Sequence, residues 1–283
     1  MKKEILLAVS GGVDSVVLLD MMAKRSDVNV TIAHFDHGIR DDSAADARFV
    51  QELAKLYSLP FVVKREELGT SASEDTARRH RYDFLRSEAE KRSATIVTAH
   101  HMDDIIETIA INVVRGTGWR GLAVMNAKGI ERPLLAITKA QIRQYALDHR
   151  LEWVEDDTNA TDRYLRNRIR RTILKYGNQN VKDTLIVLWR QQLSIRDGIE
   201  KEVNSLLFGA PDFDRYLFIM IDDSVAIELI RTVIMMRADV SLTRPQAERA
   251  LTAIKTSKPG TSAEIGSNVR LLFSRRRFIV ETP

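Results

Sequence analysis

The chain has 283 residues, of which 44% are apolar and 29% charged, so it is long enough for one large domain and a smaller one. It contains no cysteine, which excludes disulfides, thiolate metal sites and iron–sulfur clusters held by these residues. The formal net charge of +4 is compatible with a nucleic-acid partner without requiring one. No apolar run reaches the roughly 18 residues of a membrane helix, and the first residues lead into a strand rather than a signal peptide, so we expect a cytoplasmic protein.

Short β-branched runs alternate with amphipathic segments in the first half of the chain. The runs predict strands at 4–9, 28–34, 61–64 and 95–99. The spacing of apolar residues predicts helices at 16–24, 44–57, 74–91, 102–114, 139–150 and 166–176. Capping boxes mark two of the helix starts, Ser71 with Glu74 and Thr138 with Gln141. This order is typical of an α/β fold with a doubly wound parallel sheet.

The segment 177–180 reads Gly-Asn-Gln-Asn and predicts a break, so we place the end of a first domain at residue 180. The second domain, 181–283, is predicted to be a smaller α+β unit that begins with a helical linker. Its expected elements are helices at 181–207, 224–236 and 244–256, a strand at 216–221, and a β meander that ends at 278–280. No chemically reactive cluster gathers in it, so we expect it to support the first domain or to contact RNA.

A glycine-rich loop follows the first predicted strand at once. It reads Ser10-Gly11-Gly12-Val13-Asp14-Ser15 and leads into a helix. Such a turn directs backbone amides and the positive end of the helix dipole at one point, which suits a phosphate. The hydroxyls of Ser10 and Ser15 add donors. The loop lacks the Gly-Lys-Ser/Thr ending of a Walker A motif, so the lysine that usually contacts terminal phosphates is missing from it.

Four polar residues stand where the second strand ends: His34, Asp36, His37 and Arg40. A lone histidine is usually a packing residue. In an open parallel sheet, however, the carboxyl edge beside the first loop is where ligands bind. We therefore expect this group to contact an adenosine or the substrate, with Arg40 neutralising phosphate charge.

An acidic face is predicted on the helix after the fourth strand. His100, Asp104 and Glu107 have i, i+4 and i+7 spacing, and Asp103 lies beside them. Carboxylates in a first turn also favour the helix dipole, so a solvated helix start is one alternative. As a site, the face would suit either a magnesium ion on pyrophosphate or the ammonium group of lysine.

Arginines gather in a segment between residues 163 and 171. They are Arg163, Arg166, Arg168, Arg170 and Arg171. A solvated helix face is the simpler interpretation, but lysine and arginine also supply most protein contacts to RNA phosphates. Arg115 precedes Gly116-Thr117-Gly118, whose glycines permit close approach of the backbone to a bound group.

The string from Ser10 to Ser15 resembles the PP-loop of the ATP pyrophosphatases, which cleave ATP between its α and β phosphates. Within that superfamily the chain resembles the tRNA(Ile)-lysidine synthetases over roughly residues 4–175. The strings that carry the resemblance are His34–Arg40, Glu74–Tyr82, Ala99–Thr108, Arg115–Gly118, Arg132–Leu135, Trp153–Asn159 and Arg166–Arg170. The second unit matches the family's appended domain only loosely, and the chain looks like a short version without a further C-terminal domain.

The resemblance implies a two-step ligase reaction of tRNA modification. ATP adenylates the C2 carbonyl oxygen of the wobble cytidine in the CAU anticodon of tRNA(Ile), and the ε-amine of L-lysine then displaces AMP. The lysidine so formed changes the specificity of the tRNA from methionine to isoleucine. ATP and Mg²⁺ are the implied cofactors, no membrane is involved, and the sequence leaves a homodimer open.

The resemblance also implies roles for residues. Catalytic roles fall to Asp14, Asp36, His100, Asp104 and Glu107. ATP contacts are expected from the loop 10–15 and from His34, His37 and Arg40. Asp104 and Glu107 are favoured for lysine recognition, with Arg78 or Arg81 at the lysine carboxylate. The remaining substrate contacts, to RNA, are assigned to Arg115, Arg163, Arg166, Arg168 and Arg170.

Three alternatives stay open at this stage. A tRNA thiolase of the same loop family is one, although the lack of cysteine counts against sulfur delivery. An amidating ligase such as an NAD or GMP synthetase is another, against which stand the missing glutaminase domain and the arginine-rich segment. The third is a nucleotide- or RNA-binding module without turnover, which a pyrophosphate-release assay separates from an enzyme.

Overall fold

A computed structural model of the chain describes residues 2–38, 43–69, 74–155, 169, 172, 178–207, 212–266 and 268–282. The chain divides into two compact units, Met1–Leu193 and Ser194–Pro283, and the division lies inside the long helix α7 (Gln179–Leu207). Each unit has an apolar core of its own. The domain boundary at residue 180 stays a prediction. In the part of the chain that is described, no helix is both long and apolar enough to cross a membrane.

The first unit is built on a parallel sheet, as the alternation of strands and helices predicts. Its described strands are β1 (Lys3–Ala8), β2 (Val28–Asp36), β3 (Phe61–Arg65), β4 (Thr95–Val97) and β5 (Ile130–Glu131). They lie in the order β3-β2-β1-β4-β5, and every neighbouring pair is parallel. The carboxyl ends of β1, β2 and β4 therefore meet at one edge. Only the two-residue β5 was not predicted from the sequence.

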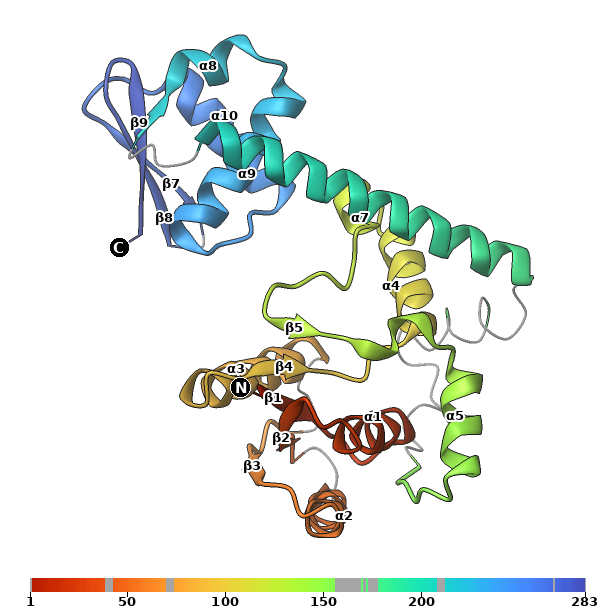
Figure 1. Ribbon diagram of the computed structural model, residues 1–283. Coiled ribbons are helices and arrows are strands. Elements are labelled where there is room, and N and C mark those ends of the chain that lie inside the picture. Colours follow the sequence, from red (N-terminus) through yellow and green to blue (C-terminus); the bar gives the residue numbers. More distant parts are fainter. Residues whose placement is uncertain are drawn as a thin grey trace. The chain divides into compact units, whose positions relative to one another are not determined.

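Helices cover both faces of this sheet (Figure 1). The described ones are α1 (Val13–Ala23), α2 (Ser43–Leu56), α3 (Glu74–Lys91), α4 (Met102–Val114) and α5 (Lys139–Asp148). Side chains of β1 alternate between two cores. Leu7 packs with α1, α2 and α5, whereas Leu6 packs with residues of α3 on the opposite face. A strand buried on both faces reads as a continuous apolar run, which explains the segment from Ile5 to Val9.

Most predicted helix starts lie within two residues of the described ones, but α1 begins at Val13, three residues before the predicted start at residue 16. Thr138 and Gln141 form the predicted capping box: the Gln141 amide donates to the Thr138 hydroxyl at 3.3 Å, and the Thr138 amide donates to the Gln141 side chain at 2.9 Å. The expected box at Ser71 and nearly all of the helix predicted at 166–176 lie outside the described residues.

The second unit is a small α+β structure, as predicted. Its elements are β6 (Phe213–Asp214), α8 (Arg215–Met220), α9 (Asp223–Ala238), α10 (Arg244–Thr256), β7 (Ser262–Gly266), β8 (Val269–Phe273) and β9 (Arg277–Glu281). The strands form an antiparallel sheet in the order β6-β9-β8-β7. The expected meander is thus confirmed.

The strand predicted at 216–221 is wrong, because this segment forms the helix α8. A short apolar run does not by itself distinguish strand from helix. Here the residue before the run decides: the Asp214 carboxylate accepts a hydrogen bond from the Tyr216 amide at 2.8 Å and so caps a helix. Phe218 is fully buried, while Tyr216 and Met220 are more than 60% exposed, at 65% and 63%.

Candidate active site

The loop from Ser10 to Ser15 joins the end of β1 to the start of α1 and is closed on itself by hydrogen bonds. The Ser15 hydroxyl accepts from the amides of Ser10 and Gly11, both at 3.2 Å, and donates to the Gly12 carbonyl at 2.9 Å. Gly11 has a φ of +95°, a conformation that side chains with a Cβ rarely adopt. The loop is therefore preformed, and the first amides of α1, which lack acceptors within the helix, point out of its end.

A lysine from a distant part of the chain reaches this loop. Asp14 lies in the first turn of α1, and both of its carboxylate oxygens accept hydrogen bonds from the Lys139 ammonium at 2.6 Å. Lys139 is the first residue of α5. The two side chains are part-exposed, at 38% for Lys139 and 29% for Asp14. This contact brings the start of α5 to the start of α1.

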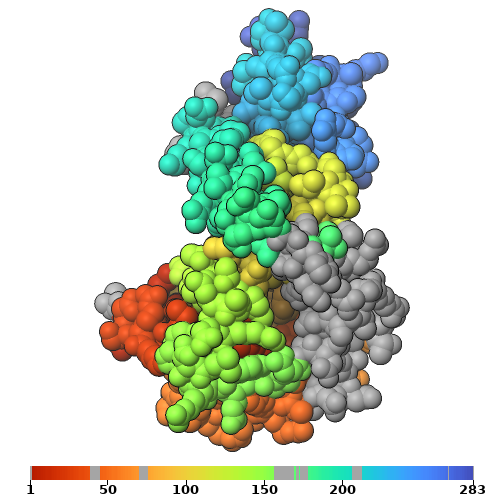
Figure 2. All heavy atoms as spheres, turned by 90° about the vertical axis from the view of Figure 1, so that its right-hand side faces the viewer, coloured from red at the N-terminus to blue at the C-terminus, as the bar shows by residue number. Residues whose placement is uncertain are grey.

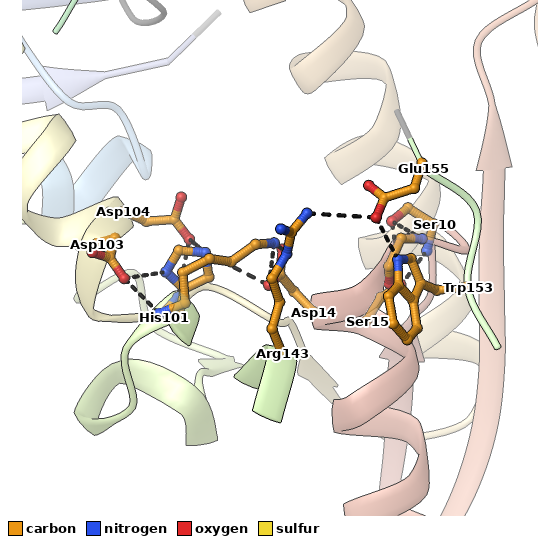
Figure 3. A network of polar contacts seen from close by, with 11 residues as sticks. Ser10, Asp14, Ser15, His101, Asp103, Asp104, Arg143, Trp153 and Glu155 are labelled. Atoms are coloured by element: carbon orange, nitrogen blue, oxygen red, sulfur yellow. Dashed lines mark hydrogen bonds and ion pairs between the residues drawn. The ribbon is translucent and has the colours of Figure 1, made fainter. Parts of the chain in front are cut away.

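The start of α4 joins the same group (Figure 3). His101 is buried, and its Nε2 lies 3.7 Å from Asp14 Oδ1 and 3.6 Å from Asp104 Oδ2. Asp103 accepts a hydrogen bond from the Lys139 amide at 2.6 Å, and Asp104 accepts one from the His101 amide at 3.0 Å. Three helix N-termini, those of α1, α4 and α5, therefore meet beside the loop. Their positive dipole ends suit a polyanion such as a phosphate chain.

The segment after α5 covers the loop from another side. The Val154 amide donates to the Gly11 carbonyl at 3.0 Å, which joins this segment to the loop backbone. The neighbouring Glu155 accepts a hydrogen bond from the Trp153 indole at 3.0 Å and lies 3.5 Å from Arg143 of α5. The loop is thus held by β1, α1 and the chain that leaves α5.

The predicted acidic face of α4 is not a solvated helix start. Glu107 has no exposed surface, and the preceding Ile105 and Ile106 are buried as well. Asp104 is 14% exposed at its side chain. The structure therefore places Asp104 at the edge of the site and Glu107 behind it, in the interior.

His100 is held at the carboxyl end of β4. Its Nδ1 lies 2.8 Å from the Thr98 hydroxyl. Burial lowers the pKa of His100 to about 3, and the nearby positive charges of Arg132, Arg78 and Arg81 act in the same direction, although Asp104 opposes them. The ring is therefore neutral at physiological pH and acts as a hydrogen-bonding group rather than as a cation.

The polar residues at the end of β2 differ in their hydrogen-bond partners. His34 is buried, and its Nδ1 lies 2.8 Å from the Val9 carbonyl, so it joins β2 to the end of β1. Asp36 is also buried and accepts a hydrogen bond from the Gly38 amide at 2.9 Å. None of the described residues hydrogen-bonds the buried Nδ1 of His37, and burial together with the charge of Arg81 lowers the pKa of this ring. Arg40 lies outside the described residues.

The predicted substrate arginines separate into three groups. Arg78 and Arg81 lie on α3 beside Tyr82, at 5.0 and 5.5 Å from its ring centre, and their charges act on His100 across the carboxyl edge of the sheet. Arg115 is exposed at the far end of α4, about 20 Å along the helix from the loop. Arg163, Arg166, Arg168 and Arg170 lie outside the described residues.

Comparison with known proteins agrees with this geometry. Residues 1–176 match the model of a family described as the PP-loop domain. A tRNA(Ile)-lysidine synthase of Chlamydia muridarum is 32% identical over 251 residues, which cover 83% of this chain and 77% of that protein. The chain belongs to the tRNA(Ile)-lysidine synthase branch of the PP-loop family.

Other lysidine synthases align over a smaller share of their own length. The enzyme of Thermotoga maritima is 34% identical over 220 residues, which cover 72% of this chain and 53% of that protein. The chain thus matches about half the length of this curated relative. Among solved structures, the U34-tRNA thiolase NcsA of Methanococcus maripaludis has a TM-score of 0.57 at 14% identity and covers 68% of this chain and 72% of its own, which shows a shared fold.

The sequence analysis missed two residues of this site, Lys139 and His101. Lys139 carries no signal beyond its place one residue after a helix cap, and the partner that it contacts is 125 residues away. His101 stood next to the predicted His100 but received no role, although it lies between three carboxylates. The place of His101 at a predicted helix start after a strand could have marked it, whereas Lys139 is found only through its tertiary contact with Asp14.

Proposed function

We propose that this chain ligates lysine to the wobble cytidine of the CAU anticodon of tRNA(Ile), with ATP as the activating substrate and an adenylated cytidine as the intermediate. Membership of the lysidine synthase branch supports this assignment. The observation that carries it in the structure is the meeting of three helix N-termini beside a closed glycine loop, an arrangement suited to a triphosphate. We place the reaction in the cytoplasm, where tRNA is available.

The chemistry requires activation because the C2 carbonyl of cytidine is a poor electrophile. Adenylation of its oxygen releases pyrophosphate and provides AMP as a good leaving group. The lysine ε-amine then attacks C2, and AMP departs with the former carbonyl oxygen. The site needs only to hold both reactants in line, which by itself lowers the barrier substantially, and it needs no covalent enzyme intermediate.

The described residues suggest a division of labour. The loop 10–15 binds the phosphates, and His37, whose Nδ1 has no hydrogen-bond partner in the part of the chain that the structure describes, contacts the adenosine. Neutral His100 hydrogen-bonds the reacting base, and Asp36 keeps the turn after β2 in shape for the nucleotide. Asp104 and Glu107 attract the lysine ammonium, while Arg78 or Arg81 pairs with its carboxylate.

Magnesium enters this scheme as part of the ATP complex. The described residues include no group of three or more histidines and carboxylates that would hold a metal ion. Mg²⁺ bound to a nucleotide commonly takes only one or two protein carboxylates, with phosphate oxygens and waters completing its shell. Asp14, at the loop exit, fits that description, and the ion would neutralise phosphate charge there.

RNA contacts are proposed for Arg115 and for Arg163, Arg166, Arg168 and Arg170. Guanidinium groups pair well with phosphate oxygens, and positive charge near the site would attract the anticodon stem. The homodimer that the sequence leaves open is tested by the mass of the protein in solution.

The deciding experiment is incubation of the protein with ATP, labelled lysine and tRNA transcripts. A transcript of tRNA(Ile) with a CAU anticodon should acquire the label with release of AMP and pyrophosphate, whereas the same transcript with a GAU anticodon should not. Pyrophosphate release without lysine incorporation would instead indicate another PP-loop reaction on RNA. No pyrophosphate release with any transcript would indicate a binding module.

A further inference from the structure

The PP-loop has no lysine of its own, yet a lysine from α5 reaches it. The Lys139 ammonium lies 2.6 Å from both oxygens of Asp14, at the point where the loop enters α1. In a Walker A loop a lysine at the corresponding place contacts the β and γ phosphates. The fold thus brings to the loop a positive charge that the loop sequence itself lacks.

The backbone of Lys139 is fixed while its side chain keeps freedom. Its amide donates to Asp103 at 2.6 Å, and the preceding Thr138 caps α5 through Gln141. The side chain is 38% exposed, and the segment that contains α5, in light green, lies on the surface shown in Figure 2. A flexible four-carbon stem can therefore turn its ammonium from Asp14 towards an anion at the loop without movement of the helix.

We propose that Lys139 binds the β and γ phosphates of ATP, the part that leaves as pyrophosphate, and that Asp14 holds its ammonium while the nucleotide is absent. This inference rests on the proposed use of ATP at the PP-loop. The phosphates bring a stronger negative charge than one carboxylate, and Asp14, once the lysine has left it, would be available to Mg²⁺ bound with them. The ammonium then neutralises the charge that collects on the leaving group.

A structural role is the competing explanation, since the same ion pair joins α1 to α5, which lie side by side (Figure 1). A second pair at the other end of α1 provides a matched control. The Lys24 ammonium lies 2.6 Å from Asp20 of α1, and the Tyr145 hydroxyl of α5 donates to the same carboxylate at 2.7 Å. Loss of Lys24 therefore disturbs the same two helices without removing a charge from the loop.

The test measures binding by calorimetry for the full chain and its Lys139→Met, Lys139→Arg and Lys24→Met variants. The probes are ATP, inorganic pyrophosphate and AMP, each with Mg²⁺ at the same concentration, because the nucleotide is proposed to bind as its magnesium complex. Lys139→Met should weaken the binding of pyrophosphate and of ATP about tenfold or more, since a charge-assisted contact is lost. The affinity for AMP should be unchanged. Lys139→Arg keeps the charge, so its affinity for pyrophosphate and ATP should fall less, about threefold. Lys24→Met should bind all three probes as the parent does.

Melting temperatures accompany the binding data, so that a misfolded variant is recognised. Equal pyrophosphate affinity in the parent and in folded Lys139→Met would overturn the role of Lys139 alone. Equal losses for AMP and pyrophosphate would also overturn it, because the residue would then not be specific for the leaving group, and so would equal losses in Lys24→Met and Lys139→Met. A parent protein that binds neither ATP nor pyrophosphate would overturn the proposed function and this inference together.

Discussion

At the scale of single residues, a substitution of Glu107 distinguishes two possible functions of the acidic side chains on α4. Its carboxylate is fully buried, behind Asp104. In the proposed function its charge acts from there on the lysine ammonium, which arrives only in the second half-reaction. The alternative is Mg²⁺ on the leaving pyrophosphate, which acts in the first.

We expect Glu107→Gln to raise the apparent KM for lysine at least about tenfold, because removal of the charge costs roughly 1.5 to 3 kcal/mol of binding. Single-turnover pyrophosphate release without lysine should survive, since adenylation precedes lysine attack. Both quantities are measured on the same variant. Loss of the first half-reaction in a variant that unfolds like the parent would contradict the lysine role and favour the metal.

His100 leads to a prediction about pH. Burial lowers its pKa to about 3, whereas an unfolded histidine has a pKa of about 6.5. Between these values the unfolded chain binds the extra proton and the native state does not. The contribution of the neutral ring to the free energy of unfolding is therefore fully present above about pH 6.5. It is lost as the pH falls towards 3, by at most about 1.4 kcal/mol per pH unit.

The variant His100→Asn should therefore lose less stability on acidification than the parent, because this protonation step is absent. Urea unfolding at a series of pH values from 7 to about 4 measures the difference. Subtraction of the two curves isolates His100 from the other titrating groups, among them His37. Parallel curves would show that the ring is protonated in the native state as readily as in the unfolded one.

At the scale of elements, one buried carboxylate joins three helices of the first unit. Asp20 of α1 accepts hydrogen bonds from Lys24 at 2.6 Å, from Tyr145 of α5 at 2.7 Å and from Tyr57, which follows α2, at 2.9 Å. Burial alone would raise the pKa of this carboxyl, but the three hydrogen bonds together hold it below its ordinary value. The group thus positions α1, and with it the PP-loop at the helix start.

We expect Asp20→Ala to lower the free energy of unfolding by about 1 to 3 kcal/mol, because it leaves two part-buried tyrosine hydroxyls without their acceptor. Urea unfolding measures the loss. The exposed Arg25–Asp27 pair provides the control, and Asp27→Asn should unfold like the parent. Similar unfolding of Asp20→Ala and the parent would show that water replaces the missing carboxylate.

At the scale of the whole molecule, the proposed substrate is a polyanion far larger than the PP-loop site, and its binding must draw on positive charge elsewhere in the chain. The arginines between 163 and 171 are the densest basic segment of the sequence. We expect Arg166→Ala, Arg168→Ala and Arg170→Ala together to weaken tRNA binding. The slope of log affinity against log salt should fall by about 0.7 to 0.9 for each phosphate contact removed.

Filter binding at several salt concentrations measures that slope, and ATP affinity should hardly change. The double variant Arg275→Ala, Arg276→Ala removes positive charge from exposed residues of the second unit and serves as the control for charge as such. An unchanged slope in the triple variant would assign the 163–171 segment to a solvated surface.

The sequence by itself determined the features that depend on local pattern. The helices at Glu74–Lys91, Met102–Val114 and Arg244–Thr256 have the predicted limits, because apolar spacing and capping residues act within a few positions. The PP-loop was identified for the same reason, since a strand, two glycines and a helix start are contiguous. The parallel sheet followed from the alternation of strands and helices.

Only the tertiary structure decided which side chains meet. The contact of Lys139 with Asp14 spans 125 residues, and the complete burial of Glu107 depends on what packs against α4. Charge and burial at a site are properties of groups brought together from several elements, and no window of sequence contains them.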